Sequence, residues 1–106
     1  MKIINLPRGY GKTTRMLYAS EFNDAPILCV SQHHKQHLLD RAKELNLQIP
    51  EPITPSDVMG GIFKTSRGDT DILIDDAQAV LRYLLSGLGM TGNIKAITIT
   101  DEEYTI

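Results

Sequence analysis

A short glycine-containing loop near the amino terminus constrains the fold of this chain more than any other feature. The stretch LPRGYGKTT, residues 6–14, follows a short apolar run and precedes an amphipathic segment. Glycines let backbone N–H groups turn inward around an anion, a lysine adds a positive charge, and the hydroxyl after the lysine can bind Mg²⁺. A helix that follows such a loop directs the positive end of its dipole at the anion. The stretch therefore predicts a strand, a phosphate-binding loop and a helix, in that order.

The loop matches the Walker A pattern G-x-x-x-x-G-K-[ST] at every fixed position except the first. Leu6 stands where the first glycine is expected, and Pro7 stiffens the exit from the strand. We expect a phosphate cradle with an altered entry. Arg8 either reaches a nucleotide phosphate or acts across an interface. The residues predicted to bind the nucleotide are Arg8, Gly9, Tyr10, Gly11, Lys12, Thr13 and Thr14.

The length and composition predict one globular domain over residues 1–106. Apolar residues make up 42% of the chain and charged residues 23%, and the net charge of -2 gives no overall attraction to nucleic acid. Cys29 lies in the apolar run PILCVS, so we expect a buried thiol in a reducing compartment. No segment approaches the roughly 18 apolar residues of a membrane span. A soluble, cytoplasmic protein with no membrane partner is expected.

Short apolar runs alternate with longer amphipathic segments along the chain. This order predicts a parallel sheet with helices packed on its faces. Strands are predicted at 2–6, 27–31 and 93–100, at the run ILI before Asp75, and briefly at Ile53. Helices are predicted at 13–22 and 33–46, and a further helix after Asp76 should be ended by Gly87 and Gly89.

A proline-rich segment separates the two halves of the chain, and a short helix is predicted after it. Ser56 is the expected N-cap of that helix, and Gly60 and Gly61 are expected to end it. Residues 64–71 are polar and turn-forming, which predicts a surface loop. Its two cations, Lys64 and Arg67, are expected to be solvated, with contact to phosphates or to a partner as the alternative.

Two consecutive acidic residues follow the apolar strand ILI. In a Walker B arrangement the first carboxylate, here Asp75, holds Mg²⁺, and the second, here Asp76, orients the attacking water. Taken alone, the two aspartates could equally well cap the next helix. The presence of the phosphate-binding loop favours the metal site. Because Asp76 is shorter than the glutamate that is more usual there, we expect slow hydrolysis.

Three stretches resemble motifs of superfamily 1 helicases. PRGYGKTT resembles motif I, ILIDDAQ motif II and ITITDEEY motif III. The resemblance implies a three-layer α/β/α RecA-like P-loop NTPase domain with a mostly parallel sheet of four to five strands. It also implies ATP and Mg²⁺ as cofactors. Its site residues would be Lys12 and Thr13 on phosphate and Mg²⁺, Asp75 on Mg²⁺, Asp76 near the water, and Gln78 as the sensor of the γ-phosphate; Thr100 and Asp101 would stand near the Gly-Asp pair of motif III.

The resemblance covers one motor domain, whereas such helicases use two. An arginine for the transition state is therefore expected from a protein partner or from another copy of the chain. The expected function is a weak ATPase in nucleic-acid metabolism, of the kind found among small phage-encoded proteins. The alternative is a non-catalytic accessory or inhibitor protein of viral type, which binds a host replication or repair protein and carries a vestigial nucleotide site.

Two further groups of side chains leave alternatives open. The histidines His33, His34 and His37 are expected at a solvated helix start, with contact to single-stranded nucleic acid as the alternative; a metal site lacks a third ligand nearby. The leucines Leu81, Leu84, Leu85 and Leu88 form a helical stripe that is either core or an oligomer face.

Overall fold

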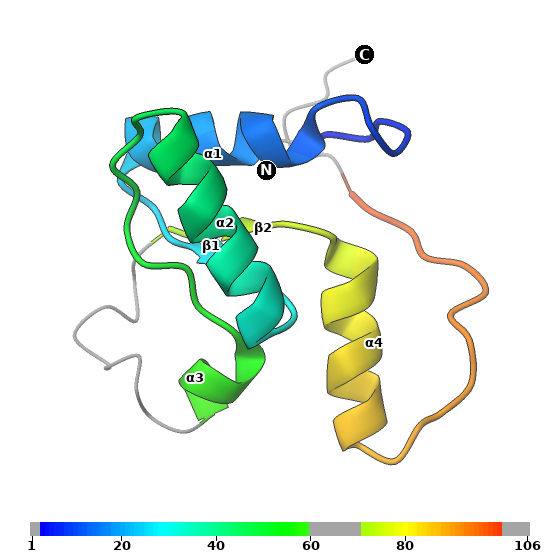
Figure 1. Ribbon diagram of the computed structural model, residues 1–106. Coiled ribbons are helices and arrows are strands. Elements are labelled where there is room, and N and C mark those ends of the chain that lie inside the picture. Colours follow the sequence, from blue (N-terminus) through cyan, green and yellow to red (C-terminus); the bar gives the residue numbers. More distant parts are fainter. Residues whose placement is uncertain (1–2, 60–70, 101–106) are drawn as a thin grey trace.

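The computed structural model describes residues 3–59 and 71–100. In these residues the chain forms four helices and two short strands (Figure 1). In chain order they are α1 (Lys12–Asn23), β1 (Ile27–Leu28), α2 (Gln32–Glu44), α3 (Pro55–Met59), β2 (Leu73–Ile74) and α4 (Ala77–Gly87). The helices predicted at 13–22, at 33–46 and after Asp76 are thus confirmed.

Strands β1 and β2 lie next to each other near the centre of the molecule and pair in parallel. Ile27 is in register with Leu73 and Leu28 with Ile74. On the other side of β1, Ile53 forms an isolated parallel bridge to Leu28, and its N–H donates to the carbonyl of Ile27 at 2.9 Å. Three segments far apart in the sequence therefore run in the same direction, as the predicted crossover connections require.

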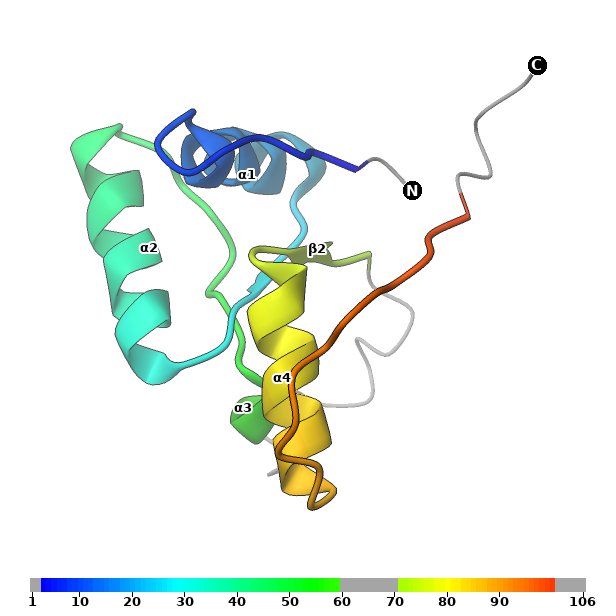
Figure 2. The ribbon, with the colours of Figure 1, turned by 90° about the vertical axis from the view of Figure 1, so that its right-hand side faces the viewer.

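The prediction of a three-layer domain with four to five strands is wrong. In residues 3–59 and 71–100 the sheet has two strands of two residues each, and helix α2 lies over one of its faces (Figure 2). Ile72 and Ile74 are 45% and 40% exposed, so the opposite side of β2 is open to solvent. The third layer that would cover these side chains is therefore missing from the described part of the chain.

The strands predicted at 2–6 and 93–100 account for the difference in strand number. Neither 3–6 nor 93–100 is paired in a sheet, and of 27–31 only the first two residues form a strand. After α4 the chain passes back along this helix and then away from the strands (Figures 1 and 2). An alternating apolar pattern specifies a strand only where a neighbouring strand is within reach, because β-propensity depends on cross-strand packing.

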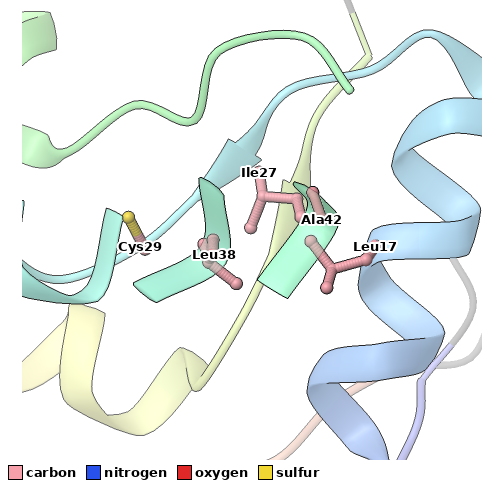
Figure 3. Packing of buried hydrophobic residues seen from close by; sticks show 5 residues of the cluster. All are labelled: Leu17, Ile27, Cys29, Leu38 and Ala42. Carbon is pink, nitrogen blue, oxygen red and sulfur yellow. The ribbon is translucent and has the colours of Figure 1, made fainter. Parts of the chain in front are cut away.

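The hydrophobic core lies between α1, β1 and α2. Its fully or almost fully buried members are Leu17, Ile27, Cys29, Leu38 and Ala42 (Figure 3). Leu38 and Ala42 are four residues apart and so lie on one face of α2. The prediction that Cys29 is a buried thiol is confirmed, since its exposed fraction is 0%. Burial raises the pKa of this thiol to about 11.

The N-cap of helix α3 lies two residues before the predicted cap, Ser56. Thr54 and Asp57 form a capping box: the Asp57 N–H donates to Thr54 Oγ1 at 3.1 Å and the Thr54 N–H donates to Asp57 Oδ2 at 3.0 Å. Pro55 occupies the first helical position, which suits its fixed φ angle. Ser56 is therefore not the N-cap, and its hydroxyl pairs with the hydroxyl of Tyr83 at 2.9 Å. The predicted end at Gly60 and Gly61 and the loop residues 64–70 lie outside the described residues.

Helix α4 ends as the glycine pattern predicts. Gly89 has a φ of 86°, its N–H donates to the carbonyl of Ser86, and the Met90 N–H donates to the carbonyl of Leu85, both at 3.0 Å. This is a Schellman motif, in which a glycine adopts the left-handed conformation. None of the helices in the described part of the chain is long and apolar enough to cross a membrane.

Candidate functional site

The loop before α1 adopts a conformation that requires its two glycines. Gly9 and Gly11 have φ angles of 86° and 80°, a region that side chains disfavour. Between them, the Tyr10 N–H donates to the Pro7 carbonyl at 3.3 Å and closes a turn. Gly11 is the N-cap of α1 and has no side chain to accept from the first N–H groups of the helix. Those N–H groups and the helix dipole favour an anion at this end.

The predicted loop residues differ in exposure. Lys12, Thr13 and Thr14 open α1 and are half-buried, whereas Arg8 and Tyr10 are exposed, Tyr10 by 66%. The loop thus presents a lysine and two hydroxyls on the first turn of a helix, with an arginine beside them on the surface. This arrangement is suitable for binding a phosphate chain.

The hydroxyl of Thr13 lies against the carboxylate of Asp75. Thr13 Oγ1 donates to Asp75 Oδ2 at 3.3 Å, across a separation of 62 residues. Asp75 follows β2 directly, and its N–H donates to the carbonyl of Leu28 in β1 at 3.1 Å. It is only 6% exposed. The first turn of α1 and the carboxyl end of β2 therefore meet, as the combined Walker A and Walker B motifs predict.

A third residue, which the sequence analysis did not place in the site, also contacts this carboxylate. His34 Nε2 lies 2.9 Å from Asp75 Oδ2, and the His34 side chain is 21% exposed. The hydrogen bond to Asp75 is the main reason why the pKa of His34 is raised above its ordinary value. His34 stands in the first turn of α2, which follows β1, and the carboxyl ends of parallel strands share one edge of a sheet.

Asp76 serves as the N-cap of α4. Its backbone is left-handed, with φ 60° and ψ 68°, and its Oδ1 accepts from the Ala79 N–H at 3.3 Å. Asp76 is exposed, whereas its neighbour Asp75 is buried. The two predicted carboxylates therefore have different environments: one points into the contact with Thr13, and the other is engaged with its own helix.

The predicted sensor, Gln78, lies at a different place. It lines a groove of about 340 Å³ between α4 and the segment 94–97, together with the side chains of Arg82 and Lys95. Among the described residues, Gln78 is not part of the hydrogen-bonded group around Asp75. Thr100 is exposed, and Asp101 lies outside the described residues.

A second group of polar side chains, next to the site, joins the start of α2 to α3 and to Glu51. Gln32 Nε2 donates to Asp57 Oδ1 at 3.1 Å, and Lys35 Nζ lies 3.5 Å from Asp57 Oδ2 and 3.2 Å from Glu51 Oε1. Burial tends to raise the pKa of Asp57, but the Thr54 N–H and the charge of Lys35 outweigh it and lower this pKa. These contacts tie the start of α2 to α3, and no motif in the sequence pointed to them.

The residues around Asp75 have the chemistry that Mg²⁺ requires. In the described part of the chain no group of three or more His, Cys, Asp or Glu side chains could hold a metal ion. Mg²⁺ does not need such a group, because it binds through one or two protein oxygens, several waters and substrate phosphates. The Thr13 hydroxyl and the Asp75 carboxylate supply hard oxygen atoms within hydrogen-bond distance of each other. They fit a Mg²⁺ ion that arrives with a nucleotide.

Comparisons with protein families, with curated proteins and with solved structures find no significant match to this chain.

Proposed function

We propose that the chain binds a nucleoside triphosphate with Mg²⁺, with ATP as the favoured nucleotide, and hydrolyses it slowly. The phosphates would lie on the loop of Gly9 and Gly11, with the Lys12 ammonium beside them. Thr13 and Asp75 would hold the metal. When bound, Mg²⁺ neutralises charge on the phosphates during phosphoryl transfer. As in the helicases whose motifs it resembles, this activity would serve nucleic-acid metabolism in the cytoplasm.

The contact between Thr13 and Asp75 carries this proposal. The two residues are 62 positions apart, and each belongs to a different motif of the predicted site. A chance Gly-Lys-Thr sequence would have no reason to lie against a buried acidic residue that directly follows a parallel strand. The N-cap Gly11 adds a second, independent support, since it has no side chain and leaves backbone N–H groups at the start of α1 without a side-chain cap.

The environment of Asp76 favours slow turnover. Its Oδ1 accepts from the Ala79 N–H, and this bond holds the short side chain at the first turn of α4, where a water would have to come to Oδ2. A missing or displaced group at this position lowers the rate of hydrolysis without weakening nucleotide binding, because it acts on the water and not on the phosphates. An arginine supplied by a partner protein or a second copy would then be needed for full activity.

A second candidate is a non-catalytic accessory protein of the viral type that binds a host replication or repair protein. The surface of α4 favours it, because Leu81, Leu84 and Leu88 are 40%, 41% and 77% exposed. Leu85, the fourth leucine of the predicted stripe, is half-buried. Exposed apolar side chains of this kind would suit a partner or oligomer face. Contact with single-stranded nucleic acid would be made by His33 and His37, which are exposed.

Calorimetric titration with a non-hydrolysable ATP analogue and Mg²⁺ tests the proposal. The wild-type protein should bind in the micromolar range. Lys12→Ala should weaken binding by about tenfold to a hundredfold, the loss expected for one hydrogen bond to a charged group. Lys43→Ala removes the same charge from an exposed position in the last turn of α2 and should leave the affinity unchanged.

The same variants separate the two candidates. Phosphate release that the wild type shows and Lys12→Ala lacks supports slow hydrolysis. A wild type that binds the analogue but releases no more phosphate than Lys12→Ala supports nucleotide binding without catalysis. If the wild type binds no analogue, the nucleotide site is vestigial and the proposal is overturned.

A further inference from the structure

Three elements meet at the carboxylate of Asp75. It follows β2, it accepts from Thr13 of α1 at 3.3 Å, and it lies 2.9 Å from His34 of α2. The nucleotide-binding motifs account for the first two elements only. We propose that His34 is a positioning residue of the metal site, whose ring Nε2–H holds the Asp75 carboxylate in the orientation that Mg²⁺ needs.

The ring must be the donor in this hydrogen bond. An ionised carboxylate only accepts hydrogen bonds, whereas a neutral imidazole has one N–H and one bare nitrogen. The proton therefore lies on Nε2, and the His34–Asp75 contact is charge-assisted. A histidine that donates to a metal-binding carboxylate fixes the rotamer of that carboxylate, and hydrogen-bonded partners of this kind tune metal affinity.

The helix that carries His34 is itself firmly held. The His34 N–H donates to Oγ of Ser31, the N-cap of α2, at 3.2 Å. Leu38 and Ala42 follow His34 at four-residue intervals on the same face, and both are buried in the core. The backbone of His34 is thus held by the cap on one side and by core packing on the other, which limits the positions that the imidazole can take next to the carboxylate.

The two carboxylate oxygens of Asp75 differ in their hydrogen bonds. Both side-chain contacts, from Thr13 and from His34, end on Oδ2. Oδ1 accepts no hydrogen bond from any residue in 3–59 or 71–100, and the whole side chain is 9% exposed. Oδ1 is therefore the oxygen left for Mg²⁺ or for a water bound to it, while His34 keeps Oδ2 in place.

This inference rests on the proposed function, and its test measures the contribution of the metal separately from nucleotide binding. The affinity for the non-hydrolysable ATP analogue is measured with excess Mg²⁺ and again with a chelator, and the ratio of the two gives the gain due to Mg²⁺. His34→Ala should reduce this gain by about tenfold to a hundredfold, the usual effect of losing a partner of a metal ligand. The affinity without metal should not change.

Rescue by a matched donor separates positioning from a merely structural role. His34→Gln places an amide N–H at about the reach of Nε2 and should restore the Mg²⁺ gain to within about threefold of the wild type. Lys43→Ala, at an exposed position in the last turn of the same helix, should behave as the wild type. Circular dichroism shows whether each variant is folded. If His34→Ala is unfolded, the Mg²⁺ gain of the folded His34→Gln variant is compared with that of the wild type instead.

Each outcome has a distinct meaning. A wild-type gain that His34→Ala loses and His34→Gln recovers supports the inference. A gain that His34→Ala keeps, or a folded His34→Gln variant that lacks it, overturns the inference and leaves the proposed function intact. A wild type that does not bind the analogue at all overturns both.

Discussion

Replacing Leu17 with alanine should destabilise the protein strongly. Leu17 is 0% exposed and packs in the core cluster with Ile27 and Leu38 (Figure 3). The change removes three carbon atoms from the core, and at about 0.8 kcal/mol per buried methylene the lost transfer free energy is about 2.4 kcal/mol. A cavity left behind adds to this cost, so that about 3–4 kcal/mol is expected. That is a large fraction of the roughly 5–15 kcal/mol that stabilises a typical domain.

Urea unfolding followed by circular dichroism measures this loss as a lower transition midpoint at an unchanged slope. Phe22→Ala is the matched control, because Phe22 lies on the same helix and is 89% exposed. It should change the free energy of unfolding by no more than about 0.5 kcal/mol. If Leu17→Ala and Phe22→Ala cost the same small amount, α1 is not anchored through Leu17 and the account of the core is wrong.

Three further predictions concern single side chains. Asp76→Ala should lower the free energy of unfolding by about 0.5–2 kcal/mol in urea titrations, because α4 loses its N-cap, and Asp76→Asn should keep most of the stability. Cys29 should react with a thiol reagent far more slowly in the native protein than in urea, since it is buried and its pKa is raised to about 11; equal rates would contradict its burial. The pKa of Asp57 is lowered in the folded state, so its contribution to stability is present above the unfolded value of 3.8 and is lost as the pH falls through the folded value. Urea midpoints measured across the acidic range should fall less steeply for Asp57→Asn than for the wild type, and parallel curves would refute this assignment.

Local sequence signals predicted the helices well and the sheet poorly. Helix α2 follows from apolar residues at three- and four-residue spacing, and the end of α4 follows from Gly89, because both signals act within a few residues. Strand pairing depends on distant partners. The segment 93–100 has an apolar pattern suitable for a strand, yet it lies apart from β2, and the exposed Ile72 and Ile74 show that one side of that strand has no cover.

The contact between Thr13 and Asp75 could be expected from the motifs, whereas their binding of Mg²⁺ stays a prediction. Thr13 and Asp75 belong to two motifs of known spacing, and the structure brings them together. His34 was missed because it stands in no motif, 41 residues from its partner, among histidines expected to be solvated. One signal could have found it: His34 follows β1 as Asp75 follows β2, and parallel strands end at the same edge. The capping role of Asp76 was weighed from the sequence, but only the backbone of α4 assigns it.

A double-mutant cycle on nucleotide binding tests most directly the claim that Thr13 and Asp75 form one metal site. The affinity for the non-hydrolysable ATP analogue with Mg²⁺ is measured for the wild type, Thr13→Val, Asp75→Asn and the double variant. If both side chains act on one ion, each single change weakens binding and the double variant is little worse than the weaker single variant, with a coupling of about 0.5–3 kcal/mol. Losses that simply add, or binding that neither change affects, would show that the contact between the two residues is not a metal site.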